Sequence, residues 1–392
     1  MRRFGPGAAV LLATGVDVGL LLVLYAGADW SVPAADAVAL LVAAPVSYLL
    51  HRLTDRGADP FVRWAREPRR FAVVALVAGL ADLAVLSILV VALDEPSTAA
   101  VLAGKVVALA VAAMVRVVGH RRIFQQTIRA EQAAPTGRPP APGDRRLSVV
   151  LPAYHQPEVA AEAVGRIRDA IGASVGVADL EIVVVDDGSG DDTAARAEAA
   201  GADQVVVHPQ NRGKGAAVRS GAAVARGRTI AFTDADLAYD PAHLLVLLER
   251  IEEGWDVAVG SRRHTDAVTL VRARRLREVG GRVINLLSQA VLLGHYRDTQ
   301  CGLKGFRADV APIVLGQGLI DGFAFDIEVF HLVERNGLSM VEVPVQVENS
   351  DVSSVRAGRD GIRLVRDLFR IRRYAATGRY DEVVARPEPE AR

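Results

Sequence analysis

Arg228-Thr-Ile-Ala-Phe-Thr-Asp-Ala-Asp236 joins an apolar, β-branched run to two aspartates that are one residue apart. The run up to Thr233 predicts a buried strand. A second run of this kind, 180–185, also ends on two aspartates, Asp186 and Asp187. Ligands of open α/β sheets bind beyond the carboxyl ends of the strands, and carboxylates placed there can hold a divalent cation that still accepts phosphate oxygens. We therefore predict a nucleoside diphosphate site, against the alternative that Asp-rich turns only end strands and cap helices.

The segments around these aspartates alternate between strand-like and helical patterns. Strands are predicted at 147–151, 181–186, 204–207, 229–233 and 256–259, and helices at 157–174, 191–200, 214–226 and 241–253. This alternation predicts an α/β domain with a mainly parallel, Rossmann-like sheet.

Four motifs fall at the predicted strand ends: Leu151-Pro-Ala-Tyr-His155, Asp186-Asp187-Gly188-Ser189, Asn211-Arg-Gly-Lys-Gly215 and Asp234-Ala-Asp236. The glycines of the third motif let the backbone approach a ligand closely, and Lys214 places a cation at a helix N-terminus. The motif lacks the spacing of a P-loop, and no Gly-x-Gly-x-x-Gly turn follows the first strand. P-loop and dinucleotide-binding folds are therefore disfavoured.

The first third of the chain has the composition of a membrane domain. Four apolar segments, 8–28, 33–50, 71–93 and 97–119, each approach the roughly 20 residues that span a bilayer. Arginines gather before the first segment, between the second and third, and at the end of the fourth: Arg2, Arg3, Arg52, Arg56, Arg63, Arg66, Arg69, Arg70, Arg116, Arg121 and Arg122. The positive-inside rule predicts a multi-pass cell-membrane protein whose termini and catalytic domain face the cytoplasm.

The membrane segments form a weak repeat, in which Arg-Phe, an aspartate inside the span and a closing His-Arg pair occur twice. Ionisable residues are costly in lipid and mark functional positions, so Asp17 and Asp82 are candidates, with Lys105 as their partner. The alternative is that Lys105 snorkels to the interface and the aspartates only pair helices. The repeat resembles the GtrA-like membrane domain over residues 1–125. That resemblance implies a role in moving polyprenyl-phosphate-linked sugars across a membrane.

The remaining boundaries follow from composition. Residues 126–146 are rich in Pro and Gly and predict a flexible or semi-extended linker. A catalytic domain is predicted over 147–380 and a disordered tail over 381–392. The chain has 46 basic and 46 acidic residues, and no aromatic-basic stripe of the nucleic-acid-binding kind. Its single cysteine, Cys301, excludes an intrachain disulfide and is expected to be buried structure. A homo-oligomer is compatible with the sequence.

In this order and spacing the four motifs resemble family 2 glycosyltransferases of the GT-A fold, over about 147–380. The resemblance implies that Asp234 and Asp236 hold Mg²⁺ or Mn²⁺, with Asp236 the direct ligand, and that Lys214 lies near the nucleotide. A nucleotide sugar is further implied to contact Pro152, Ala153, Tyr154, Asp186, Asp187, Gly188 and Ala235. Two positions depart from the family pattern: His155-Gln156 replaces Asn-Glu, and Ala238 replaces a polar metal ligand of some relatives.

Later segments carry candidates for binding the acceptor. Arg262 and Arg263 are suited to a phosphate, and Asp298, Gln300, Lys304, Asp326 and Glu328 to sugar or phosphate contacts. The basic, partly apolar stretch Thr269–Arg297 and a helix near the C-terminus are predicted to lie on a membrane surface. In that helix Ile362, Val365, Phe369 and Ile371 alternate with Arg363, Arg366, Arg370, Arg372 and Arg373. An ordinary helix packed on the domain is the alternative.

The segments Asp298-Thr-Gln-Cys-Gly302, Phe325-Asp-Ile-Glu328 and Asp367-Leu-Phe-Arg-Ile-Arg372 resemble polyprenyl-phosphate sugar synthases, most closely the dolichyl-phosphate β-glucosyltransferase branch. The resemblance implies inverting transfer from UDP-glucose, or from GDP-mannose, to a polyprenyl phosphate. Such a phosphate is mostly dianionic near neutral pH and is already a nucleophile. Catalysis then needs positioning and charge stabilisation, for which Asp236, Lys214 and Arg262 are the candidates.

Two other functions are kept open. A protein or soluble-sugar acceptor would need a general base, for which Asp326 is the candidate. A lipid-linked sugar flippase or scaffold is the alternative from a different class, with a glycosyltransferase half that binds ligand without catalysis. In the leading hypothesis the membrane bundle anchors the enzyme and helps to translocate the product.

Overall fold

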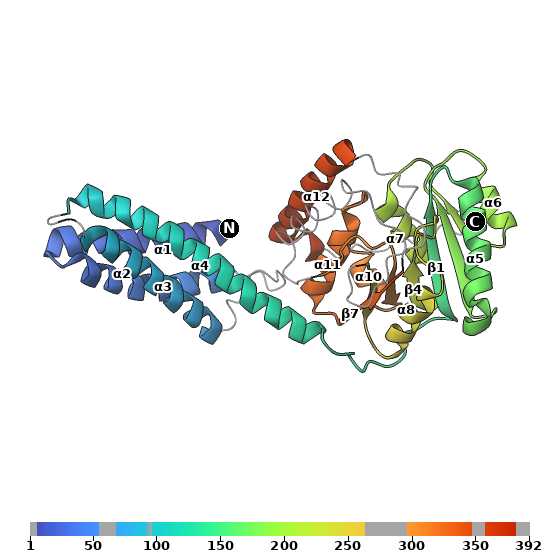
Figure 1. Cartoon of the computed structure of the whole chain (residues 1–392), viewed down its shortest axis with the longest axis horizontal. Helices are drawn as coiled ribbons and strands as arrows, with labels where there is room; N and C mark the ends of the chain where they lie inside the picture. Colours follow the sequence, from blue (N-terminus) through green and yellow to red (C-terminus); the bar gives the residue numbers. More distant parts are fainter. Residues whose placement is uncertain are drawn as a thin grey trace. The chain divides into compact units, whose positions relative to one another are not determined.

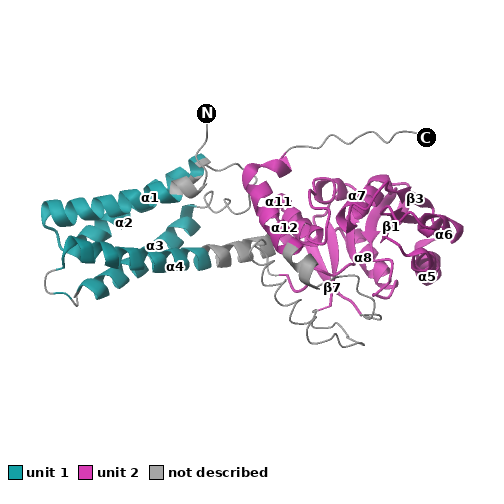
Figure 2. Cartoon of the chain, turned by 90° about the horizontal axis from the view of Figure 1, so that it is seen from above, with its two compact units in different colours: residues 1–127 teal, residues 128–392 magenta. Residues whose placement is uncertain are grey.

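The computed structural model describes residues 6–54, 68–91, 93, 96–262, 296–346 and 357–381. The chain divides into two compact units, Met1–Thr127 and Ile128–Arg392, which Figure 2 colours teal and magenta. Several positions named above lie outside the described residues: Arg2, Arg3, Arg56, Arg63, Arg66, Arg263, nearly all of the 269–297 stretch, and the tail from 382 onward.

The first unit is a bundle of four apolar helices: α1 (Pro6–Leu22, continued by the π-helical turn η1, Val23–Gly27), α2 (Val32–Thr54), α3 (Pro68–Val91) and α4 (Thr98–Gln132). Each contains a stretch long and apolar enough to cross a membrane, and Figure 1 shows them side by side. Small residues such as Ala35 and Ala39 are buried between the helices, whereas Leu41 and Met114 are exposed. Small residues inside and large apolar ones outside are typical of helices packed in lipid. The predicted four-helix architecture is confirmed.

The second unit contains a seven-stranded sheet in the order β3-β2-β1-β4-β6-β5-β7. Its strands are β1 (Arg145–Ala153), β2 (Leu180–Asp186), β3 (Gln204–Val207), β4 (Gly227–Phe232), β5 (Val257–Ser261), β6 (Lys304–Arg307) and β7 (Met340–Pro344). β6 is antiparallel to β4 and β5, and the other pairs are parallel. The predicted Rossmann-like, mainly parallel sheet is confirmed.

Helices cover both faces of the sheet (Figure 1). One face packs against α5 (Pro157–Val175), α6 (Thr193–Ala199) and α8 (His243–Glu252). The other face packs against α7 (Lys214–Val224), α10 (Ala311–Val314), α11 (Phe325–Asn336) and α12 (Ala357–Thr377). The 3₁₀ turn η3 (Arg379–Asp381) follows α12. Every residue of β2 is buried, because a parallel strand between two helical layers has no solvent-facing side. Such strands appear in the sequence as continuous apolar runs.

The linker prediction needs a correction. α4 continues to Gln132, past the predicted linker start at 126, and the segment that follows it is docked on the second unit. The Thr136 N–H donates to Gly254 O (3.0 Å), Arg138 lies 3.5 Å from Asp256, and Arg307 donates to the Pro139 carbonyl (2.7 Å). Proline restricts the chain to extended conformations, so fixing residues 133–144 against the sheet costs little entropy. We call these residues the strap.

The prediction for the C-terminal helix is wrong in one respect. Ile371 of α12 is fully buried, together with Leu364 and Leu368, in the core beneath the sheet. The apolar face of the helix therefore packs on its own domain. Phe369 points outward and is 72% exposed. It is the most exposed of the described apolar residues that were predicted to face the membrane.

The packing of α7 on the sheet gives a test of the fold. A Cβ added to Gly221 would lie 2.4 Å from Val150 Cγ1 and 2.9 Å from Val185 Cγ2. Gly221→Ala should therefore separate α7 from the sheet and destabilise the protein by about 1–3 kcal/mol. Chemical denaturation of the full chain, followed by near-ultraviolet circular dichroism, measures the loss.

Gly165→Ala is the matched control, because an added Cβ on this α5 residue would meet nothing within 4 Å. We expect it to be neutral or to stabilise the helix by up to about 1 kcal/mol. Equal destabilisation by both variants would contradict the close approach at Gly221.

Candidate active site

The four predicted motifs meet at one edge of the sheet. Ala153 pairs in register with Asp186, and Val150 pairs with Phe232 of β4 two residues before Asp234. The first, second and fourth motifs thus end three adjacent parallel strands. The loop that carries the third motif, 211–214, donates backbone N–H groups to the Asp187 carboxylate, as described below. This convergence at the carboxyl edge is the arrangement predicted from the sequence.

Asp234 is held between a cation and a glycine. Its Oδ1 lies 2.5 Å from Lys214 Nζ, and its side chain keeps 33% of its surface exposed. A Cβ on Gly302 would lie 2.0 Å from Asp234 Oδ2, so only glycine allows this approach. Asp234 therefore combines a fixed position with access to a ligand.

Lys214 is the first residue of α7, and its ammonium lies over the rings of Phe232 and Phe325, 5.7 and 5.8 Å from their centroids. Burial disfavours the charged ammonium, but Asp234 and Asp326 outweigh it and raise the Lys214 pKa above its usual value. The lysine is therefore a permanent cation at the start of a helix, where anions bind.

Asp236 is less tightly engaged than Asp234. Its Oδ1 accepts one hydrogen bond, from the Ala238 N–H at 3.2 Å. Burial raises the Asp236 pKa and the charge of Asp234 adds to the effect, while the Ala238 N–H and Lys214 act in the opposite direction. Leu237, between Asp236 and Ala238, has a positive φ of 43°. This is a strained conformation of the kind found at functional sites. A cation at this turn would relieve the repulsion between the two carboxylates.

The second motif has an internal role that the sequence did not reveal. Asp187 is buried and accepts from the N–H groups of Arg212 (2.9 Å) and Gly213 (2.7 Å) and from Nδ1 of His208 (2.7 Å). Asp186 accepts from the Ser189 N–H and hydroxyl. Both carboxylates are thus committed to shaping loops, and Asp187 sets the position of Lys214 by holding the turn before it.

The first motif is more open. Tyr154 is 44% exposed and its ring contacts that of His155, with 4.3 Å between centroids. His155 has a positive φ of 51°, donates its N–H to Ser189 Oγ, and places its ring 3.0 Å from Asp191. Pro152 is half-buried and Ala153 buried. Gly188 has a φ of 77° and lies against the Gln210 backbone, where no side chain would fit. Tyr154 therefore offers the exposed ring of this edge, and His155, where the sequence departs from the family pattern, fixes the neighbouring loop.

Behind the aspartates lies a second ion pair, which unlike the first is buried. Lys304 is fully buried and contacts Asp326 as well as the Cys301 carbonyl (2.6 Å). Asp326 is 3% exposed. Burial raises the Cys301 pKa to about 11, so this thiol is neutral and structural, as the sequence suggested. Asp326 and Lys304 are thus placed to support the Asp234 region from beneath.

Arg262 and Asp298 form a bidentate pair. Nε and Nη2 of Arg262 donate to the two oxygens of Asp298 at 2.6 and 2.9 Å. Beside the pair, the buried Gln300 Nε2 and Ser261 Oγ have no hydrogen-bond partner in the described part of the chain. Buried polar groups are normally satisfied, so these two atoms point to a polar ligand. Arg262 remains 41% exposed.

Glu328 was predicted to contact the sugar or the phosphate, but the structure gives its carboxylate other partners. Its carboxylate is 1% exposed and accepts from the N–H groups of Leu319 and Ile320 and from the Tyr380 hydroxyl, all within 2.9 Å. These three groups of the protein itself use the hydrogen-bonding capacity of the carboxylate. Burial raises the Glu328 pKa. This residue holds the 319–320 loop and is not a sugar or phosphate contact.

Comparison with known proteins gives the family. Residues 148–312 match the model of glycosyl transferase family 2, and residues 8–124 match the GtrA/DPMS transmembrane domain. A dolichyl-phosphate beta-glucosyltransferase of Drosophila melanogaster is 33% identical over 243 residues, which cover 57% of this chain and 74% of the relative. The chain belongs to glycosyl transferase family 2. A polyprenol monophosphomannose synthase of Mycolicibacterium smegmatis is 30% identical over 246 residues, 60% of this chain and 89% of the relative.

Among solved structures, a glucosyl-3-phosphoglycerate synthase of M. tuberculosis is similar with a TM-score of 0.45 and 21% identity, covering 64% of this chain and 84% of that chain. With its four apolar helices and family 2 domain, the protein is a membrane glycosyltransferase.

Two regions of the glycosyltransferase lie away from the strand ends. In the membrane unit, Asp17 and Asp82 both contact Lys105, as predicted. Asp36 also contacts Lys105, which was not predicted.

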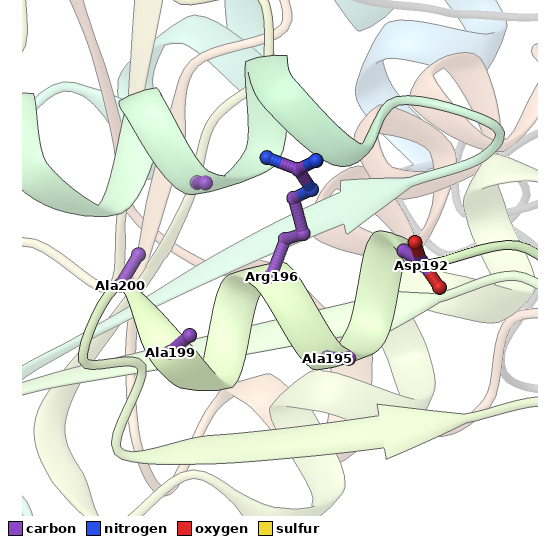
Figure 3. A pocket seen from close by; sticks show the side chains of 6 residues that line it. Asp192, Ala195, Arg196, Ala199 and Ala200 are labelled. Carbon is purple, nitrogen blue, oxygen red and sulfur yellow. The ribbon is translucent and has the colours of Figure 1, made fainter.

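In the second unit, Figure 3 shows a pocket lined by Ala161, Asp192, Ala195, Arg196, Ala199 and Ala200. It is mostly methyl groups on α5 and α6 and contains none of the motif residues.

Three further residues lie at the candidate site and were not predicted from the sequence. His208 follows β3 and joins Asp187 to Ser220 Oγ (2.8 Å), Gly302 makes room for Asp234, and Tyr239 is buried against Cys301. Gly302 had a signal, because it ends the Asp298–Gly302 motif. His208 had none, since its partner lies 21 residues earlier in the chain.

The raised pKa of Asp236 predicts how donor binding depends on pH. If Asp236 binds a metal that holds the nucleotide, binding requires its carboxylate form, so affinity should fall with decreasing pH at a pH above that expected for a free aspartate. Asp234→Asn removes a neighbouring negative charge and should move this fall to lower pH. Lys214→Gln removes a positive charge and should move it to higher pH. Titration of a fluorescent nucleoside diphosphate with Mn²⁺ over a pH series measures both.

Asp169→Asn, an exposed residue of α5, controls for the general effect of charge. Shifts of both site variants in one direction would contradict the electrostatic assignment.

The glycine beside Asp234 gives a steric test. Gly302→Ala would drive a methyl group into Asp234 Oδ2 and displace the carboxylate. We expect kcat to fall roughly 100-fold, the scale of an ångström of misplacement, while the protein stays folded. Gly172→Ala, whose added Cβ would lie 3.8 Å from its nearest neighbour, should keep full activity. Unchanged kcat in Gly302→Ala would show that Asp234 is not needed in this position.

Proposed function

We propose that the protein transfers a sugar from a nucleotide donor to a polyprenyl phosphate, with inversion at the anomeric carbon, to give a polyprenyl-phosphate β-sugar. The observation that carries the proposal is the Lys214–Asp234–Asp236 group at the sheet edge of a chain that also holds a four-helix membrane domain. The names of two relatives, a dolichyl-phosphate glucosyltransferase and a polyprenol phosphomannose synthase, support a lipid phosphate acceptor. UDP-glucose is the favoured donor, and GDP-mannose is the alternative.

The chemistry of the two carboxylates fits a divalent cation. Asp234 and Asp236 project from one turn, and their mutual repulsion contributes to the raised Asp236 pKa. The described residues contain no group of three His, Cys, Asp or Glu side chains that could hold a metal, so phosphate oxygens and water would complete the shell of Mg²⁺ or Mn²⁺. Such an ion would neutralise charge on the departing diphosphate. Asp236 would be the main ligand, since Lys214 contacts Asp234.

The residues of the chain assist the leaving group in their own right. Lys214 is charged, fixed by Asp234 and flanked by two aromatic rings, so its field acts at low local dielectric. We infer that it stabilises the nucleoside diphosphate as the glycosidic bond breaks. Tyr154, exposed at the end of β1, is placed to contact the nucleoside.

The acceptor side favours a phosphate nucleophile. A hydroxyl acceptor would need a general base, and the candidate Asp326 is ion-paired with Lys304 and nearly inaccessible. A phosphate monoester needs no base. Arg262, held in place by Asp298, would position it, with Gln300 and Ser261 as further polar contacts.

The membrane unit is proposed to anchor the enzyme in the cell membrane with the catalytic domain on the cytoplasmic side, and to help translocate the product. The arginine-rich loops of the sequence support this orientation. Phe369, between the exposed arginines of α12, is proposed to contact the lipid surface.

A donor panel tests the proposal. The full-length protein in detergent is given polyprenyl phosphate, Mg²⁺ and radiolabelled UDP-glucose or GDP-mannose, and the lipid product is extracted and counted. We expect transfer from UDP-glucose and at least a 100-fold loss in Asp236→Ala, on the scale of losing a group that stabilises the transition state.

Asp169→Ala should transfer at the wild-type rate, because this side chain is exposed on α5. Failure of every donor, with intact nucleotide binding, would favour the flippase or scaffold alternative. Full activity in Asp236→Ala would overturn the assignment of the metal turn.

A further inference from the structure

The four membrane helices each bring one ionisable side chain to a single point. Lys105 of α4 lies 3.0 Å from Asp17 of α1, 2.6 Å from Asp36 of α2 and 2.6 Å from Asp82 of α3, measured from its Nζ to the nearest carboxylate oxygens. All four side chains are at least 96% buried, with exposures of 1%, 4%, 0% and 0%. We call these residues the bundle cluster.

The bundle cluster has more acceptors than its lysine can satisfy. One oxygen of each carboxylate, Asp17 Oδ1, Asp36 Oδ2 and Asp82 Oδ1, is buried without a hydrogen-bond partner in the described part of the chain. Each belongs to a carboxyl group whose other oxygen contacts Lys105, so all three lie within the cluster. A buried acceptor without a donor is costly. Three such atoms together indicate that some of these carboxyl groups are protonated.

The charge count leads to the same conclusion. Three carboxylates and one ammonium have a net charge of −3 + 1 = −2. Arg116 of α4 also acts on Asp17 through its field, but it is only half-buried and, among the described residues, forms no ion pair with the four side chains, so it is not counted in the cluster. A net charge of this size inside an apolar bundle is strongly disfavoured, and ionisable groups in such places take up protons.

We propose that Asp17, Asp36, Asp82 and Lys105 form a proton-binding centre that holds two protons on its carboxyl groups while the lysine stays charged. Two protons reduce the net charge to zero and supply two O–H donors to the unpartnered oxygens. Lys105 keeps its charge because all three carboxyl groups face its ammonium.

An ion pair that only holds helices together would not explain the number of carboxyl groups. One lysine and one aspartate would join two helices as a neutral pair, whereas here every helix of the bundle contributes and two carboxyls are in excess. A metal ion could also balance the charge, but the residues that the structure describes contain no His, Cys, Asp and Glu group arranged to hold one.

The centre has a consequence for the bundle. Loss of either proton leaves an uncompensated charge in the core, so it requires water or another cation to reach the cluster. Opening of the bundle is thereby linked to proton release. This inference does not depend on the proposed sugar transfer, which concerns residues of the second unit.

Infrared spectroscopy of the full-length protein in lipid nanodiscs tests the centre. Protonated carboxyl groups have a C=O band that is separate from those of carboxylates and amides and that shifts in D₂O. At neutral pH, Asp36→Asn lowers the charge excess to one, so the band should lose the intensity of one carboxyl group. Lys105→Gln raises the excess to three, so the band should gain the same intensity.

Asp169→Asn, which changes an exposed carboxylate of α5, should leave the band unchanged. Where Lys105→Gln does not fold, Asp17→Asn replaces it and should also lose one carboxyl intensity. A band that responds to neither cluster variant would overturn the proposal. So would a wild-type band that disappears when K⁺ is replaced by Na⁺, because the cluster would then bind a metal cation instead of protons.

Discussion

The contact between Lys214 and Asp234 is the interaction on which the rest of the catalytic edge depends. It joins the first residue of α7 to the residue that follows β4, and it forms only because several backbone segments approach without side chains. Gly213 and Gly215 lie against the 320–322 loop, and Gly302 lies against Asp234. Two aromatic rings flank the ammonium and lower the local dielectric. A motif that looks in the sequence like a basic loop therefore forms a fixed charge at the carboxyl edge of the sheet, where the proposed diphosphate leaving group would gain its own charge.

The parts of the fold that could be predicted are those with a local signal. The strands β1 to β5 are long or continuous apolar runs, and four of the second unit's helices begin close to the predicted positions. β6 and β7 have four and five residues, and β6 contains Lys304 and Gly305, so only its partners on both sides make it a strand. Within the site, the sequence indicated which carboxylates gather at the edge. It could not separate those that face a ligand from those, such as Asp187 and Glu328, whose oxygens are satisfied by distant backbone groups.

The membrane unit shows the same limit in another form. The repeated hairpin pointed to Asp17 and Asp82, which occupy matching positions in the first helix of each hairpin. It also held an unused signal, because Asp36 and Lys105 both lie early in the second helix. Two hairpins with ionisable residues at corresponding places bring all four side chains to one level of the bundle. Pseudo-symmetry thus predicts a meeting point even where the residue types differ between the two copies.

The strap is attached at one edge of the sheet. Its hydrogen bonds reach Gly254 and Asp256 before β5, Arg226 before β4 and Arg307 at the end of the antiparallel β6. All of these positions lie at the amino edge of the sheet, opposite the edge that carries Lys214 and Asp234. The attachment of this segment and the proposed site thus occupy opposite edges of the same strands. The segment that follows α4 is therefore attached to the sheet without contacting the edge that carries the proposed catalytic groups.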